Sequence, residues 1–453
     1  MRVSGLSHFP HGQPVPLRDH AVCVSLPTFN DLIGYEEKRS ETLAAMRSGY
    51  PRFVKSHFIT ELSNHLSKVA GGKDSEIFFF KQISDSDFFL KLHGIPPFCR
   101  GEFDDVVFLQ FPPESKEALQ CKLFQQHSGT GISSRLAEDI LYRRGIIGDR
   151  EFIDESSASS TEQIKRTIAK AHGPKTGPDD VMLTSSGANA FFSIFRTAIE
   201  HSSKKGKKIW IRLGWLYLDT IEAMELFVDE ELQIISINTP KDLSKLKSIF
   251  KDFGEKIAGV VTELPTNPLL QSFDIEAVKG LCEANDALLI VDPTMASPQN
   301  VKITDFADVV VNSLTKYANW EGDVMMGCLV FPKSSARGRE LMLETEKNSC
   351  FPFERDLRRL AAQMPFYEQF VKETNSSTLK VADFLETHPV VKKVHWSYQS
   401  DCSKEYEKVA GFNRPGCVIS FEIKSDFKKF YDGLRMLKSP SFGTEFSICC
   451  PYV

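Results

Sequence analysis

The sequence predicts an α/β protein with a mostly parallel β-sheet that is covered by helices on both faces. From about residue 180, short apolar runs alternate with longer amphipathic segments. The short runs are rich in β-branched residues, as is typical of strands buried on both faces of a parallel sheet. The predicted strands are residues 208–212, 232–237, 257–262, 287–291 and 309–312.

Helical patterns lie between these strands, for example at residues 220–227 and 275–285. Strands that alternate with helices in this way form βαβ units, which join parallel neighbours. In such sheets, ligands bind outside the carboxyl ends of the strands. The polar residues that fall at these ends are Glu263, Asp292 and Lys316.

The length of 453 residues exceeds the usual size of one hydrophobic core, so we expect more than one domain. Residues 1–150 would form an N-terminal arm and a subfamily-specific region, with apolar runs at 77–80 and 106–110. Residues 151–350 would form the large domain. Residues 351–453 would form a smaller α/β domain, with helices at 353–372 and 375–387 and a strand at 416–423.

The composition excludes several functional classes. With 55 basic and 60 acidic residues, the net charge of −5 offers no basic field for nucleic acid. No apolar run approaches the roughly 20 residues that cross a bilayer, and no secretion signal is visible, so we expect a cytoplasmic protein. Ten cysteines without a Cys-x-x-Cys pair predict reduced thiols and no metal site.

Two of the strand ends carry residues that suit a covalently held aldehyde cofactor. Lys316 follows the apolar run at 307–311, with Ser313 and Thr315 just before it. Asp292 ends the preceding strand, where a buried carboxylate can keep a ring nitrogen protonated. An aspartate in this position can also cap a turn or a helix. The combination of lysine and acid predicts a site for pyridoxal 5′-phosphate (PLP).

A phosphate site and a ring-stacking residue are predicted as well. The stretch Thr184–Ala190 leads into a helical pattern, and the N-terminus of a helix favours anions. Ser185 or Ser186 would cap that helix, and Gly187 would let the backbone approach the phosphate. An ordinary capped helix has the same pattern. Tyr217 could stack on the cofactor ring, although an aromatic residue there could equally belong to the core.

The order of these motifs resembles the γ-family of fold-type I PLP enzymes, the cystathionine γ-synthase and γ-lyase group. The resemblance covers about residues 180 to 425. Its segments are Ser186-Gly-Ala, Tyr217-Leu-Asp-Thr, Glu263–Leu270, Val291–Pro298, Ser313–Tyr317 and Asn375–Val391. The N-terminal half is similar to the longer, fungal-type cystathionine γ-synthases at His20–Thr28, Ser48–Phe53 and Gln126–Arg135.

The resemblance implies roles for individual residues. Lys316 would hold the cofactor, Asp292 would pair with the ring nitrogen, and Tyr217 would stack on the ring. Lys316 and Tyr217 would also act in catalysis. Asn267 would hydrogen-bond the 3′-oxygen of the cofactor. Gly187, Ala188, Ser313 and Thr315 would hold the phosphate, and Ser186 and Thr294 would also belong to the cofactor site.

The implied reaction is γ-replacement on O-acetyl- or O-succinylhomoserine, in which cysteine adds to give cystathionine. This reaction belongs to transsulfuration and methionine biosynthesis. Replacement with another nucleophile in specialised metabolism, a lyase reaction and a catalytically impaired family member stay open as alternatives. The resemblance also implies a homodimer or homotetramer with shared active sites, acting on small amino acids.

This sequence departs from the family at several positions. Ala188 stands where the family has methionine, and Trp320-Glu321 replaces the Gly-His that usually follows the lysine. In the family, a Tyr-x-Arg pair from the neighbouring subunit clasps the phosphate. Either Tyr50-Pro-Arg52 or Gln126–Arg135 could supply this cation, and the shorter separation from Gly187 favours Arg135.

The end of the chain departs from the family as well. The family continues beyond a segment like Ser441–Glu445 to an arginine that binds the substrate α-carboxylate. Such an arginine is a main source of substrate orientation. We therefore expect the small C-terminal domain to be incomplete, which leaves turnover by this chain open.

Overall fold

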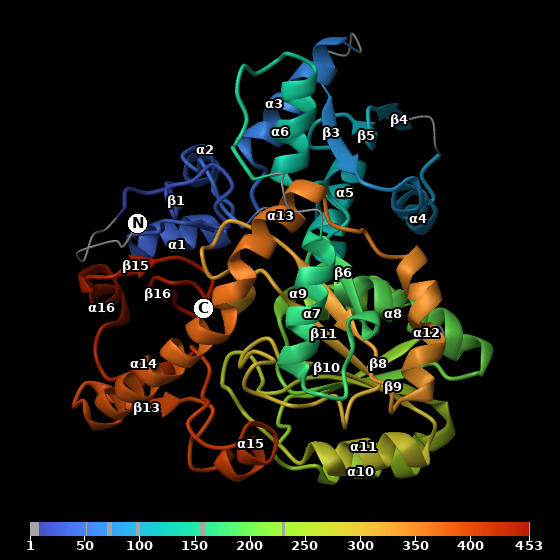
Figure 1. Cartoon of the computed structure of the whole chain (residues 1–453), viewed down its shortest axis with the longest axis vertical. Helices are drawn as coiled ribbons and strands as arrows, with labels where there is room; N and C mark the ends of the chain where they lie inside the picture. Colours follow the sequence, from blue (N-terminus) through green and yellow to red (C-terminus); the bar gives the residue numbers. More distant parts are fainter. Residues whose placement is uncertain are drawn as a thin grey trace.

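A computed structural model describes residues 9–50, 52–69, 75–96, 100–154, 159–228 and 232–452. Within these ranges, the largest sheet has seven strands in the order β6-β12-β11-β10-β9-β7-β8 (Figure 1). Strand β12 runs antiparallel to both of its neighbours, and the other pairs are parallel. The predicted, mostly parallel sheet is confirmed. The strands are β6 (Val181–Thr184), β7 (Ile209–Leu213), β8 (Gln233–Ile237), β9 (Ile257–Glu263), β10 (Leu288–Asp292), β11 (Val309–Ser313) and β12 (Gly327–Val330).

Each predicted strand of this sheet is present, within one residue at either end. Strands β6 and β12 were not predicted from the sequence. Each has only four residues, which is too short for a recognisable period. The sheet is buried on both faces, because alternate residues of β10 enter different cores. Leu289 and Val291 join one apolar cluster, while Leu288 and Ile290 join the other.

Helices cover both faces of the sheet. One cluster contains residues of α7, α10, α11 and α13, and the other contains residues of α8, α9 and α12. Their bounds are α7 (Ser160–His172), α8 (Gly187–Lys204), α9 (Leu218–Glu225), α10 (Ser244–Phe253), α11 (Ile275–Ala284), α12 (Ala336–Lys347) and α13 (Glu354–Gln363). None of the described helices is long and apolar enough to cross a membrane.

The region before residue 155 contains a folded unit as well as an arm. Its strands β3, β5 and β4 form an antiparallel sheet in that order, at the top of Figure 1. Phe89, Phe124 and Phe192 share one of its apolar clusters, so this unit packs directly on α8. The elements are α3 (His57–Val69), β3 (Glu76–Phe80), α4 (Ile83–His93), β4 (Arg100–Phe103), β5 (Val106–Phe111), α5 (Lys116–Ser128) and α6 (Ser134–Arg143).

The first described residues lie beside the C-terminal part of the chain (Figure 1). The backbone N–H of Leu26 donates to the carbonyl of Lys438 at 3.0 Å. The N-terminal elements are β1 (Pro14–Val15), β2 (Cys23–Val24), α1 (Phe29–Glu36) and α2 (Ser40–Ala44). The C-terminal elements are α14 (Tyr367–Thr387), β13 (Val391–His395), α15 (Ser403–Ala410), β14 (Ser420–Ile423), α16 (Phe427–Gly433), β15 (Leu437–Lys438) and β16 (Ile448–Cys449).

Two boundaries predicted for the C-terminal part were wrong. The helix predicted to run to residue 372 ends at Gln363, because Pro365 lies in the following 3-10 turn and lacks a backbone N–H. Helix α14 then continues without a break across residues 373–375. The strand predicted from Gly416 begins only at Ser420. Gly416 has a positive φ of 82°, and its N–H bonds the side chain of Asn375.

Candidate active site

The carboxyl ends of β9, β10 and β11 bring Glu263, Asp292 and Lys316 to one edge of the sheet. Glu263 and Asp292 are directly paired in the parallel register of β9 and β10. Lys316 lies in the turn after β11 and is half-buried. Parallel strands end together, so the predicted acid and lysine share one site, as expected.

The Lys316 amine lies between segments from both ends of the chain. Its Nζ donates to Oγ of Ser441 at 3.2 Å. It also lies 4.9 Å from the ring centre of Tyr50 and 5.0 Å from that of Phe442. Gly443 closes the loop on Lys316, because its φ is +80° and an added Cβ would lie 2.7 Å from the N atom of Tyr317. Two aromatic side chains therefore lie next to the Lys316 amine.

The paired carboxyl groups lack a cationic partner. Asp292 accepts the N–H of Thr294 at 2.7 Å, and Glu263 accepts the N–H of Tyr217 at 2.5 Å. Burial raises the pKa of Asp292 to about 6. Burial, followed by the charge of Asp292, raises the pKa of Glu263 well above its usual range. No cationic side chain of the described residues acts on either carboxyl group. A protonated ring nitrogen would supply that partner, so the residues fit PLP.

The N-terminus of α8 forms an anion cradle beside these groups. Ser186 caps the helix, with its Oγ accepting the N–H of Asn189 at 3.0 Å. The N–H groups of Gly187 and Ala188 belong to the first turn, where no carbonyl within the helix can accept them. A Cβ at Gly187 would lie 2.8 Å from Cβ of Ser313, so only glycine leaves room there. Backbone N–H groups and a hydroxyl thus meet in a space that suits a phosphate.

Two hydroxyls of the predicted cofactor site, those of Thr294 and Thr315, have partners within the protein. Thr294 Oγ1 accepts from the N–H of Ser313 at 2.9 Å, which ties the loop after β10 to β11. Thr315 Oγ1 donates to the carbonyl of Met326 and accepts its N–H, at 3.1 and 3.0 Å. These hydroxyls brace the strand ends, and their contact with a phosphate stays a prediction.

Asn267 lies at the same edge of the sheet, in the turn after β9. It is half-buried, and its backbone N–H hydrogen-bonds the side chain of Glu263. Glu263 pairs with Asp292 and also accepts from Tyr217, so the three predicted cofactor residues Asn267, Asp292 and Tyr217 surround one buried carboxyl group.

Arg135, which the sequence favoured as the cation for the phosphate, pairs with acids of its own chain in this structure. The side chain of Arg135 is buried, and Glu151 holds its Nε at 2.5 Å. Its Nη1 donates to the carbonyl of Asp323 at 2.7 Å and to the carboxylate of Asp356 at 3.2 Å. Arg135 therefore neutralises buried acids that join α6 to α13 and to the loop after Lys316.

Arg52, the other candidate, lies beside Tyr217. Its Nη2 donates to the hydroxyl of Tyr217 at 3.0 Å, and its Nη1 lies 2.7 Å from Asp219. The guanidinium also lies 5.0 Å from the ring centre of Tyr50. Separation along the sequence therefore did not predict which of the two arginines lies beside Tyr217.

Sequence reasoning missed Asp219 and His127. His127 Nδ1 lies 2.9 Å from Asp219 Oδ1, and Asp219 in turn faces Arg52. Both residues lie inside stretches that were singled out, Tyr217-Leu-Asp-Thr and Gln126–Arg135. The signal that the sequence offered was a polar residue close to the motif tyrosine Tyr217. Gly129 of the second stretch packs on the cradle, since an added Cβ would lie 2.4 Å from Oγ of Ser186.

We expect the substitution Gly187→Ala to weaken cofactor binding roughly tenfold and to cost about 1 to 3 kcal/mol of stability, because its Cβ would collide with Ser313. A PLP titration followed by intrinsic fluorescence measures the first effect, and thermal unfolding of the apoprotein measures the second. Gly280→Ala in α11 is the matched control, because nothing lies within 4 Å of its added Cβ. Equal PLP affinity in both variants would show that residue 187 does not form the cradle.

The comparison with protein families agrees with this geometry. Residues 157–450 match the family described as "Cys/Met metabolism PLP-dependent enzyme". The chain belongs to this family. Its cofactor is therefore PLP, and its large sheet is that of the fold-type I enzymes. A crystal structure of cystathionine γ-synthase from Xanthomonas oryzae pv. oryzae in complex with cystathionine has the same fold, with a TM-score of 0.54 and 20% identity over 67% of this chain and 77% of that one.

Curated relatives of this PLP enzyme cover nearly its whole length. An L-2-amino-4-chloropent-4-enoate dechlorinase/desaturase from Streptantibioticus cattleyicolor is 29% identical over 97% of this chain and 88% of its own. The cystathionine γ-synthase of Neurospora crassa is 24% identical over 98% of this chain and 91% of its own. The resemblance to the cystathionine γ-synthase group is confirmed, and it extends through the N-terminal region.

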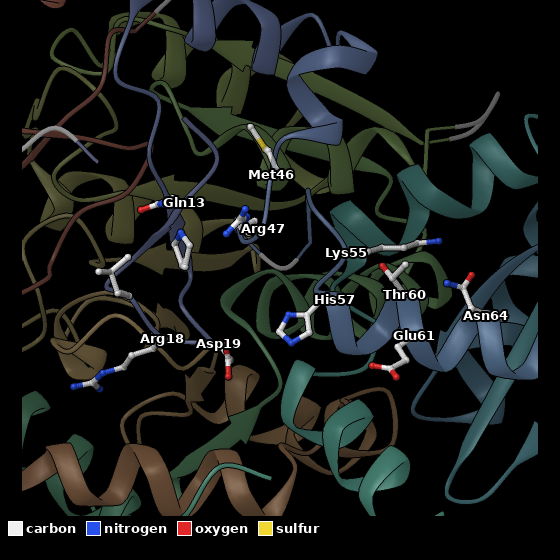
Figure 2. Close-up of a pocket in the computed structure, with 12 residues that line it drawn as sticks. Gln13, Arg18, Asp19, Met46, Arg47, Lys55, His57, Thr60, Glu61 and Asn64 are labelled. Carbon is white, nitrogen blue, oxygen red and sulfur yellow. The ribbon is translucent and has the colours of Figure 1, made fainter. Parts of the chain in front are cut away.

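A separate pocket of about 880 Å³ lies between the N-terminal segment and α3 (Figure 2). Arg18, Arg47, Lys55 and His57 are among its lining residues, as are the acids Asp19 and Glu61. A smaller cavity of about 70 Å³ lies closer to the cradle and is lined by residues that include Arg52 and Gly129. The lining of the larger pocket does not include Lys316, Asp292 or Tyr217, so it is not the PLP site.

Proposed function

We propose that this PLP enzyme acts on L-amino acids that carry a leaving group on the γ-carbon. Its reaction would be γ-replacement on O-acetyl- or O-succinylhomoserine with cysteine, which gives cystathionine for transsulfuration and methionine biosynthesis. One observation carries this proposal: the Lys316 amine, the paired acids Glu263 and Asp292, and the cradle of α8 meet at one sheet edge. We further propose a cytoplasmic homodimer or homotetramer.

Each residue of the site would have a separate role in the reaction. Bound PLP withdraws electrons from the α-carbon of an amino acid. Lys316 would move protons to and from the substrate carbons, and its aromatic surroundings would keep water away. Asp292 would hold the proton on the ring nitrogen. Tyr217, oriented by the 3.0 Å bond from Arg52, would cover one face of the ring.

The two tyrosines beside Arg52, Tyr50 and Tyr217, have opposite electrostatic environments. Burial raises the pKa of Tyr50, but Lys316 and Arg52 outweigh it, and the resulting pKa lies below the usual value. Burial, reinforced by Asp219, raises the pKa of Tyr217 well above its usual value despite Arg52. Groups whose pKa values are separated in this way suit opposite roles in proton transfer. Tyr50 would therefore accept a proton, while Tyr217 would stay protonated.

A second candidate reaction is loss of a γ-halide without replacement. The dechlorinase/desaturase relative supports it, because its 29% identity over nearly the whole chain exceeds the 24% of the Neurospora cystathionine γ-synthase. Both reactions break a bond at the γ-carbon after the same proton transfers. They differ in whether a nucleophile then adds.

Product analysis of the purified PLP-loaded enzyme separates these reactions. Incubation with O-acetyl- or O-succinylhomoserine and cysteine is expected to yield cystathionine. Formation of 2-oxobutyrate without added thiol would instead indicate an eliminating lyase. Chloride release from L-2-amino-4-chloropent-4-enoate, without cystathionine formation, would favour the second candidate. An enzyme that keeps its lysine-bound cofactor and turns over none of these substrates would contradict both.

A further inference from the structure

The cradle at the start of α8 is hydrogen-bonded to two segments that are distant in the sequence. One segment is Ser128-Gly129, at the end of α5, and the other is Cys350, after α12. The side chain of Asn189, in the first turn of α8, bonds both of them. We propose that Asn189 is a positioning residue for the cradle, and that through it the N-terminal unit of the chain, from α3 to α6, sets the affinity for PLP. This inference rests on the cofactor of the family and is independent of the substrate proposed above.

The side-chain amide of Asn189 has both of its polar atoms bonded. Its Oδ1 accepts the N–H of Cys350 at 2.8 Å, and its Nδ2 donates to the carbonyl of Ser128 at 3.3 Å. The side chain is fully buried. Exchanging the two ends of the amide would place a donor against an N–H and an acceptor against a carbonyl, so the partners fix its orientation. Aspartate and leucine are close to asparagine in size, but neither offers one donor and one acceptor.

Ser185 bonds the same two segments from the other side of the cradle. Its N–H donates to the carbonyl of Cys350 at 2.8 Å, and its Oγ donates to the carbonyl of Gly129 at 3.2 Å. Each segment is therefore bonded once before and once after residues 186–188, which form the cradle. Backbone N–H groups bind an anion well when they point to a common position, because hydrogen bonds weaken steeply with angle. Ser185 and Asn189 thus hold the short backbone between them in one orientation.

The end of α5 lies against the backbone of the cradle itself. Gly129 has a positive φ of 65°, which is typical of glycine at the end of a helix. A Cβ at this position would lie 2.4 Å from Oγ of Ser186 and 2.8 Å from the backbone N of Asn189, so only glycine leaves room for this approach. A displacement of α5 is therefore transmitted directly to the cradle.

The second partner of Asn189 is attached to the N-terminal unit as well. The thiol of Cys350 donates to the carboxyl group of Asp85 in α4 at 3.0 Å. The side chain of Gln82 donates to the carbonyl of Ser349 at 2.7 Å. Asp85 is fully buried, so its bond to the thiol is shielded from water. Both segments that bond Asn189 thus depend on the N-terminal unit for their position.

Two ligands that differ in the phosphate test the role of Asn189. The apoprotein is titrated with PLP and with pyridoxal, which has the same ring and aldehyde but no phosphate, and both titrations are followed by the visible band and intrinsic fluorescence. We expect Asn189→Ala to weaken PLP affinity roughly tenfold and to leave pyridoxal affinity unchanged. Equal losses for both ligands would overturn the proposal, because they would indicate a general structural change. Unchanged PLP affinity in the folded variant would overturn it as well.

Asn348→Ala is the matched control. The side chain of Asn348 also bonds α8, but farther along the helix, where its Nδ2 donates to Oγ1 of Thr197 at 2.9 Å. Its loss should lower the unfolding temperature of the apoprotein and change neither affinity. An equal loss of PLP affinity in Asn348→Ala would overturn the proposal, since any weakened contact of α8 would then have this effect.

Asn189→Asp is the second variant, for the case that the alanine variant does not fold. It keeps an acceptor for the N–H of Cys350 but turns an oxygen toward the carbonyl of Ser128. It should therefore show the same selective loss of PLP affinity. Wild-type affinity for PLP in Asn189→Asp would overturn the positioning role.

Asp85→Ala tests the link to the N-terminal unit, because it removes the acceptor of the Cys350 thiol and leaves the amide of Asn189 in place. We expect a roughly threefold loss of PLP affinity and no change for pyridoxal. In the Asn189→Ala background the same substitution should have a smaller effect, since part of the connection is already broken. Unchanged PLP affinity in folded Asp85→Ala, or full additivity of the two substitutions, would overturn the link. Substrate turnover enters none of these measurements, so failure of the proposed reaction leaves them unaffected.

Discussion

Replacement of Lys316 by alanine is expected to abolish covalent attachment of PLP and to lower turnover by roughly a hundred- to ten-thousand-fold. By our proposal, the Lys316 amine after β11 would bond the aldehyde and, from its place beside Tyr50 and Ser441, would move protons. The measurement is the visible absorption of the lysine-bound cofactor, followed by mass spectrometry after borohydride reduction.

Lys347→Ala is the control for this variant. Lys347 lies at the end of α12, largely exposed and paired with Glu344, so its loss should change neither the visible band nor turnover. A Lys316→Ala protein that still carries borohydride-fixed cofactor would show that another lysine forms the bond. A wild-type protein without a visible band in the presence of PLP would remove the basis of every reaction proposed above.

Asp292→Asn is expected to lower turnover roughly a hundred- to a thousandfold, while it stabilises the apoprotein. Asparagine can still accept the N–H of Thr294, but it carries no charge to hold a proton on the ring nitrogen. The gain in stability follows from the elevated pKa of about 6, which marks a carboxylate held without a partner. Few substitutions combine these opposite effects.

The contribution of Asp292 to the stability of the apoprotein depends on pH, and the direction of this dependence follows from its raised pKa. Because the folded-state pKa of Asp292 is raised, the folded apoprotein binds the proton more tightly than the unfolded chain does. Its contribution to stability is present below the ordinary carboxyl pKa of roughly 4 and is lost as the pH rises through about 6. The loss amounts to at most about 3 kcal/mol.

Thermal unfolding of the apoproteins measures this effect. Asp292→Asn should unfold at a higher temperature than the wild type at pH 8, and at a similar temperature near pH 4. Asp305→Asn is the control, because this aspartate is largely exposed and paired with Lys175. Saturation with PLP should remove the advantage of Asp292→Asn. A variant that is less stable than the wild type at pH 8 would contradict the unpaired buried carboxylate.

Much of the site could be predicted because it depends on order along the chain. Asp292 and Lys316 close successive parallel strands, and parallel strands end at the same edge of a sheet. Ser186 and Gly187 begin a helix directly after a strand, and the local sequence already predicts this helix start. The strand–helix alternation and the motif spacing therefore predicted the fold class, the family and the cofactor.

The choice between Arg52 and Arg135 required the tertiary structure. Sequence separation favoured Arg135, but Glu151 and Asp356 occupy its guanidinium. Arg52 reaches Tyr217 because the intervening residues fold into a unit of their own on α8. No local pattern states which of the two arginines will pair with Glu151 and Asp356 and which will lie beside Tyr217.

The sequence alone determined that this chain builds a PLP site on a parallel sheet, because strand ends, a helix N-terminus and their residues are local properties. Only the tertiary structure decided which parts of the N-terminal region lie beside Tyr217 and Lys316. Tyr50, Arg52, His127 and Asp219 come from separate segments, and their association depends on burial and charge pairing across the folded chain. Long-range contacts of this kind produce no hydrophobic periodicity and no fixed motif spacing that could be recognised in the sequence.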